Sequence, residues 1–180
     1  MKKLNWNTDR IIGLSVMLIS LLTLIIFIYQ TNIMRAQSRL SVTPLLSFNQ
    51  AESISDSTYR VKCGIKNKGL GPAIVESVTI IYKGERIGLR FTDFFDTHFG
   101  KFTQYANLES ETHLSKGTTL SAGEEVNFFT ISVSKSVLQE FSDYAGFDDN
   151  DPPFDIEVVY SSIYEEEWEV TLKGEGPEEL

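Results

Sequence analysis

The sequence predicts a mainly β protein: an N-terminal transmembrane helix followed by a β-sandwich with two short helical insertions. Three observations lead to this fold class. An uncharged apolar run lies near the N-terminus, and apolar and polar residues alternate in several short segments beyond residue 42. Two further segments space their aromatic residues at three and four, as on one face of a helix. A chain of 180 residues can hold one such domain and a membrane anchor.

The apolar run IIGLSVMLISLLTLIIFIY covers residues 11–29 and contains no charged residue. A helix that rises about 1.5 Å per residue crosses the hydrocarbon core of a bilayer with such a run. The run is longer than the apolar part of a typical signal peptide, and no small-residue cleavage site follows it. We therefore expect an uncleaved single-pass anchor that contacts the lipid bilayer through residues 11–29 and continues as a helix over residues 30–41.

The basic residues that flank this run indicate its orientation. Lys2, Lys3 and Arg10 precede it, whereas Arg35 and Arg39 follow it. The positive-inside rule then places residues 1–10 in the cytoplasm and the bulk of the chain outside.

Six segments have strand-like patterns and predict a sandwich over residues 42–173. They are 42–48, 58–67, 73–82, 124–133, 154–160 and 168–172. In 58–67, for example, Tyr59, Val61, Cys63 and Ile65 alternate with polar residues, which is typical of a strand with one buried face. Pro44 favours an edge position for the first strand. Residues 174–180 are predicted to form an acidic tail outside the sandwich.

The two helical insertions are predicted at residues 91–106 and 134–146. Thr92 and Ser134 are of the residue types that cap helix N-termini, and Gly146 is a typical helix stop.

The stretch NKGLGPA, residues 67–73, contains two glycines and could suggest a phosphate-binding loop. However, Pro72 has no amide hydrogen to offer to a phosphate, and the following residues read as a strand rather than a helix. We interpret the stretch as a turn between strands, in which Asn67 and the glycines tolerate positive φ.

The segments RVKCGIKNKGLGPAIVESVTIIYKGERIG and TTLSAGEEVNFFTISV resemble the bacterial adhesion-related immunoglobulin-like domains called CARDB. The matching positions are turn and core residues: Asn67, Gly69, Ala73, Gly84, Leu120, Gly123 and Glu124. The whole chain also resembles a group of bacterial membrane-anchored proteins that carry one such domain. The resemblance implies an immunoglobulin-like sandwich and a location in the bacterial inner (plasma) membrane, with the sandwich periplasmic or extracellular. It implies almost nothing about function.

Charge and motifs argue against several classes of function. Residues 140–180 carry fourteen acidic residues and only one basic residue, Lys173. Without a basic face we expect no nucleic-acid binding. His98 and His113 lack the spacing of zinc ligands, and Cys63 alternates inward as a core residue would. We therefore expect no catalytic residues, no cofactor and no metal, and the chain is not predicted to be an enzyme.

The acidic loop FDDNDPPFD, residues 147–155, is the strongest candidate for a metal site. Its carboxylate and amide oxygens are ligands that calcium prefers: Asp148, Asp149, Asn150, Asp151 and Asp155. The spacing of a calcium-binding EF-hand is missing, so a solvated loop is the preferred interpretation.

Two groups of residues are candidates for contact with a protein partner. Phe94, Phe95 and Phe99 lie in an insertion that is unusually rich in aromatic residues, and such residues dominate binding hot spots. The alternative is that this insertion folds back to close the end of the sandwich. Glu165, Glu166 and Glu167 precede Trp168 and could attract a basic partner. The preferred interpretation is a hairpin tip whose tryptophan, Trp168, tucks into the core.

The function that these observations favour is a non-catalytic, membrane-anchored interaction or accessory module, whose partner is a membrane or periplasmic protein. The alternative is a calcium-dependent adhesion-type domain that uses the 148–155 loop. An enzyme with a dispersed site is the least favoured possibility.

Overall fold

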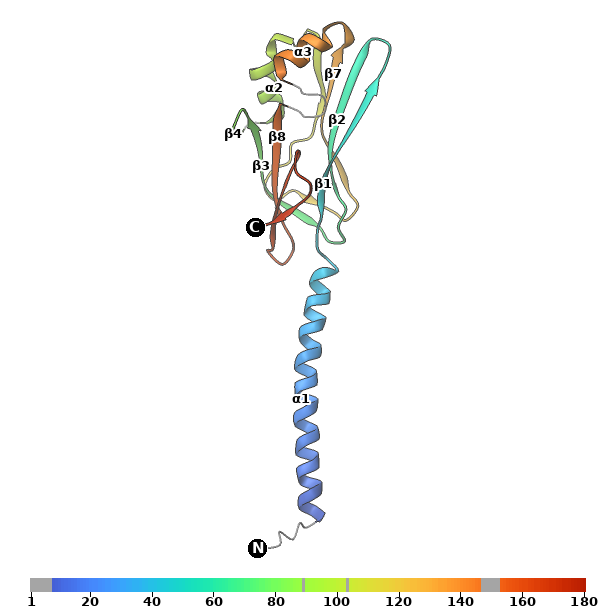
Figure 1. The fold of residues 1–180 in the computed structure, drawn as a ribbon, viewed down its shortest axis with the longest axis vertical. Helices are drawn as coiled ribbons and strands as arrows, with labels where there is room; N and C mark the ends of the chain where they lie inside the picture. Colours follow the sequence, from blue (N-terminus) through green and yellow to red (C-terminus); the bar gives the residue numbers. More distant parts are fainter. Residues whose placement is uncertain (1–7, 89, 103, 147–152) are drawn as a thin grey trace. The chain divides into compact units, whose positions relative to one another are not determined.

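The computed structural model describes residues 8–88, 90–102, 104–146 and 153–180. The chain divides into two compact units, Met1–Ser41 and Val42–Leu180. Helix α1 (Thr8–Leu40) forms the described part of the first unit, and the described strands and shorter helices belong to the second (Figure 1).

Helix α1 runs without interruption through the predicted anchor and its extension. Among the described residues it is the one helix that is long and apolar enough to span a membrane. The hydroxyl groups of Ser15 and Thr23 donate hydrogen bonds to the backbone carbonyls of Ile11 and Ile19. These bonds satisfy both hydroxyl groups within the helix itself, an arrangement that suits a hydrocarbon environment.

The second unit contains two antiparallel sheets. The first has the order β1 (Leu46–Ile54), β2 (Thr58–Asn67), β7 (Glu125–Ser134) and β5 (Ala106–Glu111). The second has the order β10 (Glu178–Glu179), β9 (Glu167–Thr171), β8 (Phe154–Ser161), β3 (Ala73–Tyr82) and β4 (Glu85–Ile87), and β6 (Thr119–Leu120) also pairs with β3. When the longer strands are lettered along the chain, β1-β2-β7-β5 is the A-B-E-D sheet and β9-β8-β3-β4 the G-F-C-C′ sheet of an immunoglobulin sandwich, to which the short strands β6 and β10 are added. The predicted fold class is confirmed.

The core lies between the inner faces of the two sheets and follows the predicted alternation. On β8, the side chains of Phe154, Ile156, Val158 and Tyr160 are all buried. The Tyr160 hydroxyl also accepts a hydrogen bond from the Leu46 amide at 3.2 Å and so links the two sheets.

The sheet differs from the prediction at its margins. The first strand begins at Leu46 rather than at residue 42, and it does occupy an edge. Residues 174–180 are not simply a tail, because Glu178 and Glu179 pair with Glu169 and Trp168 of β9. Strand β5 was not predicted at all, and it begins where the first helical insertion was expected to end.

Both predicted insertions contain helices. The first forms α2 (Phe91–Phe99) and a short 3-10 turn η1 (Gly100–Phe102), and is therefore shorter than expected. The second forms the 3-10 turn η2 (Lys135–Val137) and α3 (Leu138–Ala145), and Gly146 ends it with a φ of 80°, as predicted.

The predicted caps are wrong, because neither helical segment begins with a side-chain cap from its own N-cap residue. Instead, the carboxylate of Glu111 on β5 accepts hydrogen bonds from the backbone amides of Phe91 (2.8 Å) and Thr92 (3.2 Å). The Thr92 hydroxyl also donates to Glu111. The N-terminus of α2 is thus capped by a residue that follows it by twenty positions.

Helices α2 and α3 lie side by side at one end of the sandwich (Figure 1). The rings of Phe99 and Phe141 connect them, with centroids 5.8 Å apart, and the Tyr144 hydroxyl donates to the His98 carbonyl. The opposite end of the sandwich is formed by the loops that follow β2 and β8.

Candidate functional site

Asn67 organises the loop end of the sandwich. Its side chain is fully buried and donates from Nδ2 to the carbonyls of Gly71 (2.7 Å) and Leu120 (3.0 Å). Its Oδ1 accepts from the amides of Leu45 (3.2 Å) and Gly69 (2.9 Å). One amide side chain therefore holds together three chain segments that lie far apart in the sequence.

The stretch from residue 67 to 73 is a turn between β2 and β3, as predicted, but its glycines are needed for another reason. Neither Gly69 nor Gly71 has a positive φ. A Cβ atom at Gly71 would lie 1.7 Å from the Val42 carbonyl oxygen, and one at Gly69 would lie 2.4 Å from the Leu45 amide nitrogen. The glycines allow the first segment of the domain to cross this turn in close contact.

Residues 67–72, which lead from β2 into β3, and residues 162–167, which follow β8, are here called the loop surface. Ile74 at the start of β3 pairs with Ser161 at the end of β8, so the two loops are neighbours. Large apolar side chains are exposed on both: Leu70 (73%), Ile163 (51%) and Tyr164 (44%). Exposed apolar groups gathered on adjacent loops are typical of interaction sites.

The predicted acidic residues belong to this loop surface. Glu165 is exposed and has a φ of 62°, a strained conformation for a residue other than glycine. Glu167 is exposed at the start of β9, whereas Glu166 is half-buried and accepts a hydrogen bond from Ser162. Trp168 is half-buried and stacks on Tyr160, as expected for a hairpin tip whose tryptophan packs inward. The structure thus places acidic and apolar groups together on accessible loops.

The three phenylalanines predicted to contact a partner are instead part of the core. Phe94, Phe95 and Phe99 are exposed by 0%, 2% and 1%, respectively. Phe94 packs against Phe154 and Tyr82 with ring centroids 5.5 Å apart in each case. The helix buries these rings because they cover the end of the sandwich that the sheets leave open. The insertion therefore folds back and closes the sandwich, as the alternative interpretation of the sequence predicts.

Phe95 also lies beside a groove between α2 and the edge strand β5, here called the β5–α2 groove. Its volume is about 330 Å³. It is lined by Thr92, Phe95, Asp96, Ala106, Asn107, Leu108, Glu109, Ser110 and Glu111. No local sequence pattern indicates this groove, because a groove beside a strand edge depends on the pairing order of the sheet.

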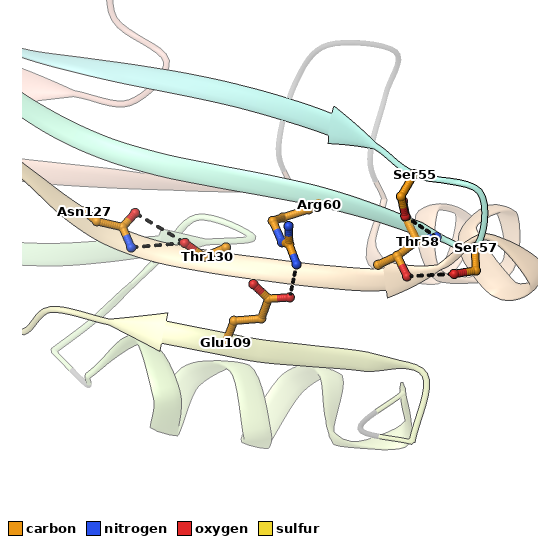
Figure 2. A network of polar contacts seen from close by, with 7 residues as sticks. All are labelled: Ser55, Ser57, Thr58, Arg60, Glu109, Asn127 and Thr130. Carbon is orange, nitrogen blue, oxygen red and sulfur yellow. Dashed lines mark hydrogen bonds and ion pairs between the residues drawn. The ribbon is translucent and has the colours of Figure 1, made fainter.

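The outer face of the first sheet carries a network of polar contacts (Figure 2). Arg60 on β2 forms an ion pair of 2.9 Å with Glu109 on β5, across the intervening strand β7. The hydrogen bond from Arg60 holds the pKa of Glu109 below its usual value. Asn127 and Thr130 contact each other farther along β7. These groups satisfy one another, as on a solvated sheet face.

Most of the predicted calcium loop lies outside the described residues, including Asp148, Asp149, Asn150 and Asp151. The carboxylate of Asp155 accepts hydrogen bonds from the amides of Ile156 (2.8 Å) and Lys173 (3.2 Å), and it therefore has a structural role.

Within the described ranges, no group of three or more His, Cys, Asp or Glu residues could hold a metal ion. His113 is exposed, whereas His98 is half-buried against the Tyr82 ring, with centroids 4.8 Å apart. Cys63 is buried, and this burial raises its pKa to about 12.

No protein-family model matches the chain, and no curated protein has a matching sequence. The resemblance to CARDB domains therefore stays a prediction, and the fold assignment rests on the strand order alone.

Proposed function

We propose that the chain is a non-catalytic, single-pass interaction or accessory module of the bacterial inner membrane. Residues 1–10 are cytoplasmic, α1 anchors the chain, and the sandwich lies on the periplasmic or extracellular side. The partner is a membrane or periplasmic protein that contacts the loop surface.

The loop surface is the observation that carries this proposal. Leu70, Ile163 and Tyr164 expose apolar groups on two adjacent loops, and Glu165 and Glu167 add negative charge beside them. Exposed apolar side chains with charged residues beside them (Glu165, Glu167 and also Lys68) are features that protein interfaces share. The segment that immediately follows α1 in the chain is bonded to one of these loops, because the Thr43 carbonyl accepts from the Leu70 amide at 3.1 Å.

Photo-crosslinking in cells tests this surface with a matched pair of tyrosines. Tyr164 on the loop surface and Tyr144 on α3 are 44% and 45% exposed, respectively, and they lie at opposite ends of β8. We expect a benzoyl-phenylalanine side chain at position 164 to give a discrete crosslinked product, and one at position 144 to give none. Charge reversal by Glu165→Lys and Glu167→Lys should weaken the product. A product at position 144 alone would refute the proposed surface.

Topology is tested separately with fusions after Leu180. A periplasmic alkaline phosphatase should be active there, and a fluorescent protein that folds only in the cytoplasm should be dark. The reverse result would place the sandwich in the cytoplasm and overturn the proposed location.

A further inference from the structure

The β5 edge of the first sheet is open to a further strand. The described sheet ends at β5, which pairs only with β7. The carbonyl of Tyr105 accepts from the Ser134 amide at 2.9 Å, so Tyr105 faces β7. Since backbone groups alternate along an antiparallel strand, those of Ala106 and Leu108 face away from β7, up to the register shift between Leu108 and Ser110. An edge with such groups is a template for strand addition.

The other sheet edges are less suited to the addition of a strand. Strands β4 and β10 have only three and two residues, respectively. Strand β1 is longer, but its residues from Asn49 to Ile54 are exposed. Along β5, in contrast, helix α2 lies beside the strand (Figure 2). The β5–α2 groove is lined by residues of both elements.

The groove combines an apolar floor with an acidic wall. Phe95 and Ala106 are buried at its floor, and Leu108 is half-buried. Every other lining side chain is polar and either neutral or acidic. Glu109 is balanced by Arg60, and Glu111 by the N-terminus of α2. Asp96 is exposed and has no ion-pair partner within the part of the chain that the structure describes.

We propose that the β5–α2 groove binds an extended segment of a partner protein by strand addition to β5, with a basic side chain of that segment beside Asp96. Main-chain hydrogen bonds to Ala106 and Leu108 provide affinity, while the apolar floor and Asp96 select the side chains. This inference rests on the proposed function in one respect only, namely that the chain binds a protein.

The charges of the groove argue against a second copy of this chain as the occupant. Antiparallel pairing of two β5 edges would bring two acidic grooves together, and neither copy would supply a basic side chain to Asp96, the groove carboxylate that no described basic group balances. Like charges that face each other across strands are destabilising. A basic segment from a different protein complements the same charges.

The test uses the full chain in lipid nanodiscs and a fluorescent peptide of about nine residues that alternates valine with lysine. We expect saturable binding by fluorescence anisotropy, and none for the matching valine–glutamate peptide. Asp96→Lys should weaken binding about tenfold, because a surface attraction becomes a repulsion of similar size. Asp56→Lys, which reverses an exposed charge in the β1–β2 turn, should leave binding unchanged.

Two further measurements decide whether binding occurs by strand addition. Leu108→Pro removes an outward-facing amide hydrogen and should abolish binding, whereas Leu108→Val should retain it. If Leu108→Pro fails to fold, infrared spectroscopy of a ¹³C-labelled peptide decides, because a peptide added to β5 acquires a β-sheet amide I band.

Equal binding of both peptides, binding without that band, or a β5-dependent dimer of the chain would each overturn the proposal. Failure of the crosslink at position 164 would refute the loop surface and leave this result unaffected.

Discussion

Replacement of Asn67 by alanine should destabilise the sandwich more than the loss of such a small side chain suggests. The change removes four hydrogen bonds from a fully buried side chain and leaves two carbonyls and two amides without their partner. At about 1 kcal/mol for each bond, the free energy of unfolding should fall by roughly 4 kcal/mol. Since a typical domain has a stability of about 5–15 kcal/mol, this is a large fraction of the total.

Urea unfolding of the full chain in detergent measures this loss. Trp168 stacks on Tyr160 in the core and reports on the sandwich, provided that Trp6 is first replaced by phenylalanine. With a urea dependence of about 2 kcal/mol per molar, the midpoint should fall by about 2 M.

Asn49→Ala is the matched control, because Asn49 is exposed and donates one side-chain hydrogen bond, to Glu125. This substitution should change the free energy of unfolding by no more than about 0.5 kcal/mol. At neutral pH, Asn67→Asp should lower the free energy of unfolding at least as much as Asn67→Ala does, because the aspartate carboxylate would face two carbonyl oxygens. If Asn67→Ala costs no more than the control, the reasoning about this buried amide is wrong.

Three other predictions follow from burial and close contact. Gly71→Ala should lower the free energy of unfolding by about 1–3 kcal/mol or more, because the new Cβ would overlap a backbone oxygen. Gly100→Ala is the control: its Cβ meets open space and its backbone is helical, so the free energy of unfolding should not change. Thermal unfolding compares the two variants. Phe94→Ala and Phe99→Ala should each cost about 3–5 kcal/mol in the same assay, and a loss below about 1 kcal/mol would contradict their place in the core. The thiol of Cys63 should resist alkylation at pH 8 until urea unfolds the chain. Burial raises the pKa of this thiol from 9.0 to about 12, so the stability that the buried thiol contributes is complete below pH 9 and is lost as the pH rises toward 12. Cys63→Ala should remove this loss of stability at high pH. Rapid alkylation of the folded chain at pH 8 would refute the burial of Cys63.

Strands with one buried face could be predicted from the sequence because their patterns are local. In β2 and β8, alternation alone identified the strand and the inward positions, as at Ile65 and Ile156. Strand β5 was missed, although Ala106 and Leu108 alternate with polar residues, because the helical spacing of the preceding aromatic residues was extended as far as residue 106. Strand β10 consists of two glutamates at an edge and has no apolar pattern to detect.

The candidate sites were less predictable because they depend on pairings between distant segments. The sequence indicated a turn at Asn67 but not its bonds to Leu45 and Leu120, which are 22 and 53 residues away. The sequence pattern around Phe94 and Phe99 is rich in aromatic residues, and it is the same whether the rings face a partner protein or the sheet. Only the position of α2 over the open end of the sandwich decides this.

The capping of α2 by Glu111 makes the helix and strand β5 one cooperative unit. A helix of nine residues is unstable in water by itself, and the amides at this N-terminus depend on a carboxylate that is positioned only when β5 has joined β7. The amides of α2 should therefore exchange with solvent deuterium at the rate of the β5 amides, through a shared opening event. Late ordering of this unit would leave the β5 edge unformed in the nascent chain, and an edge that does not yet exist cannot capture the wrong strand.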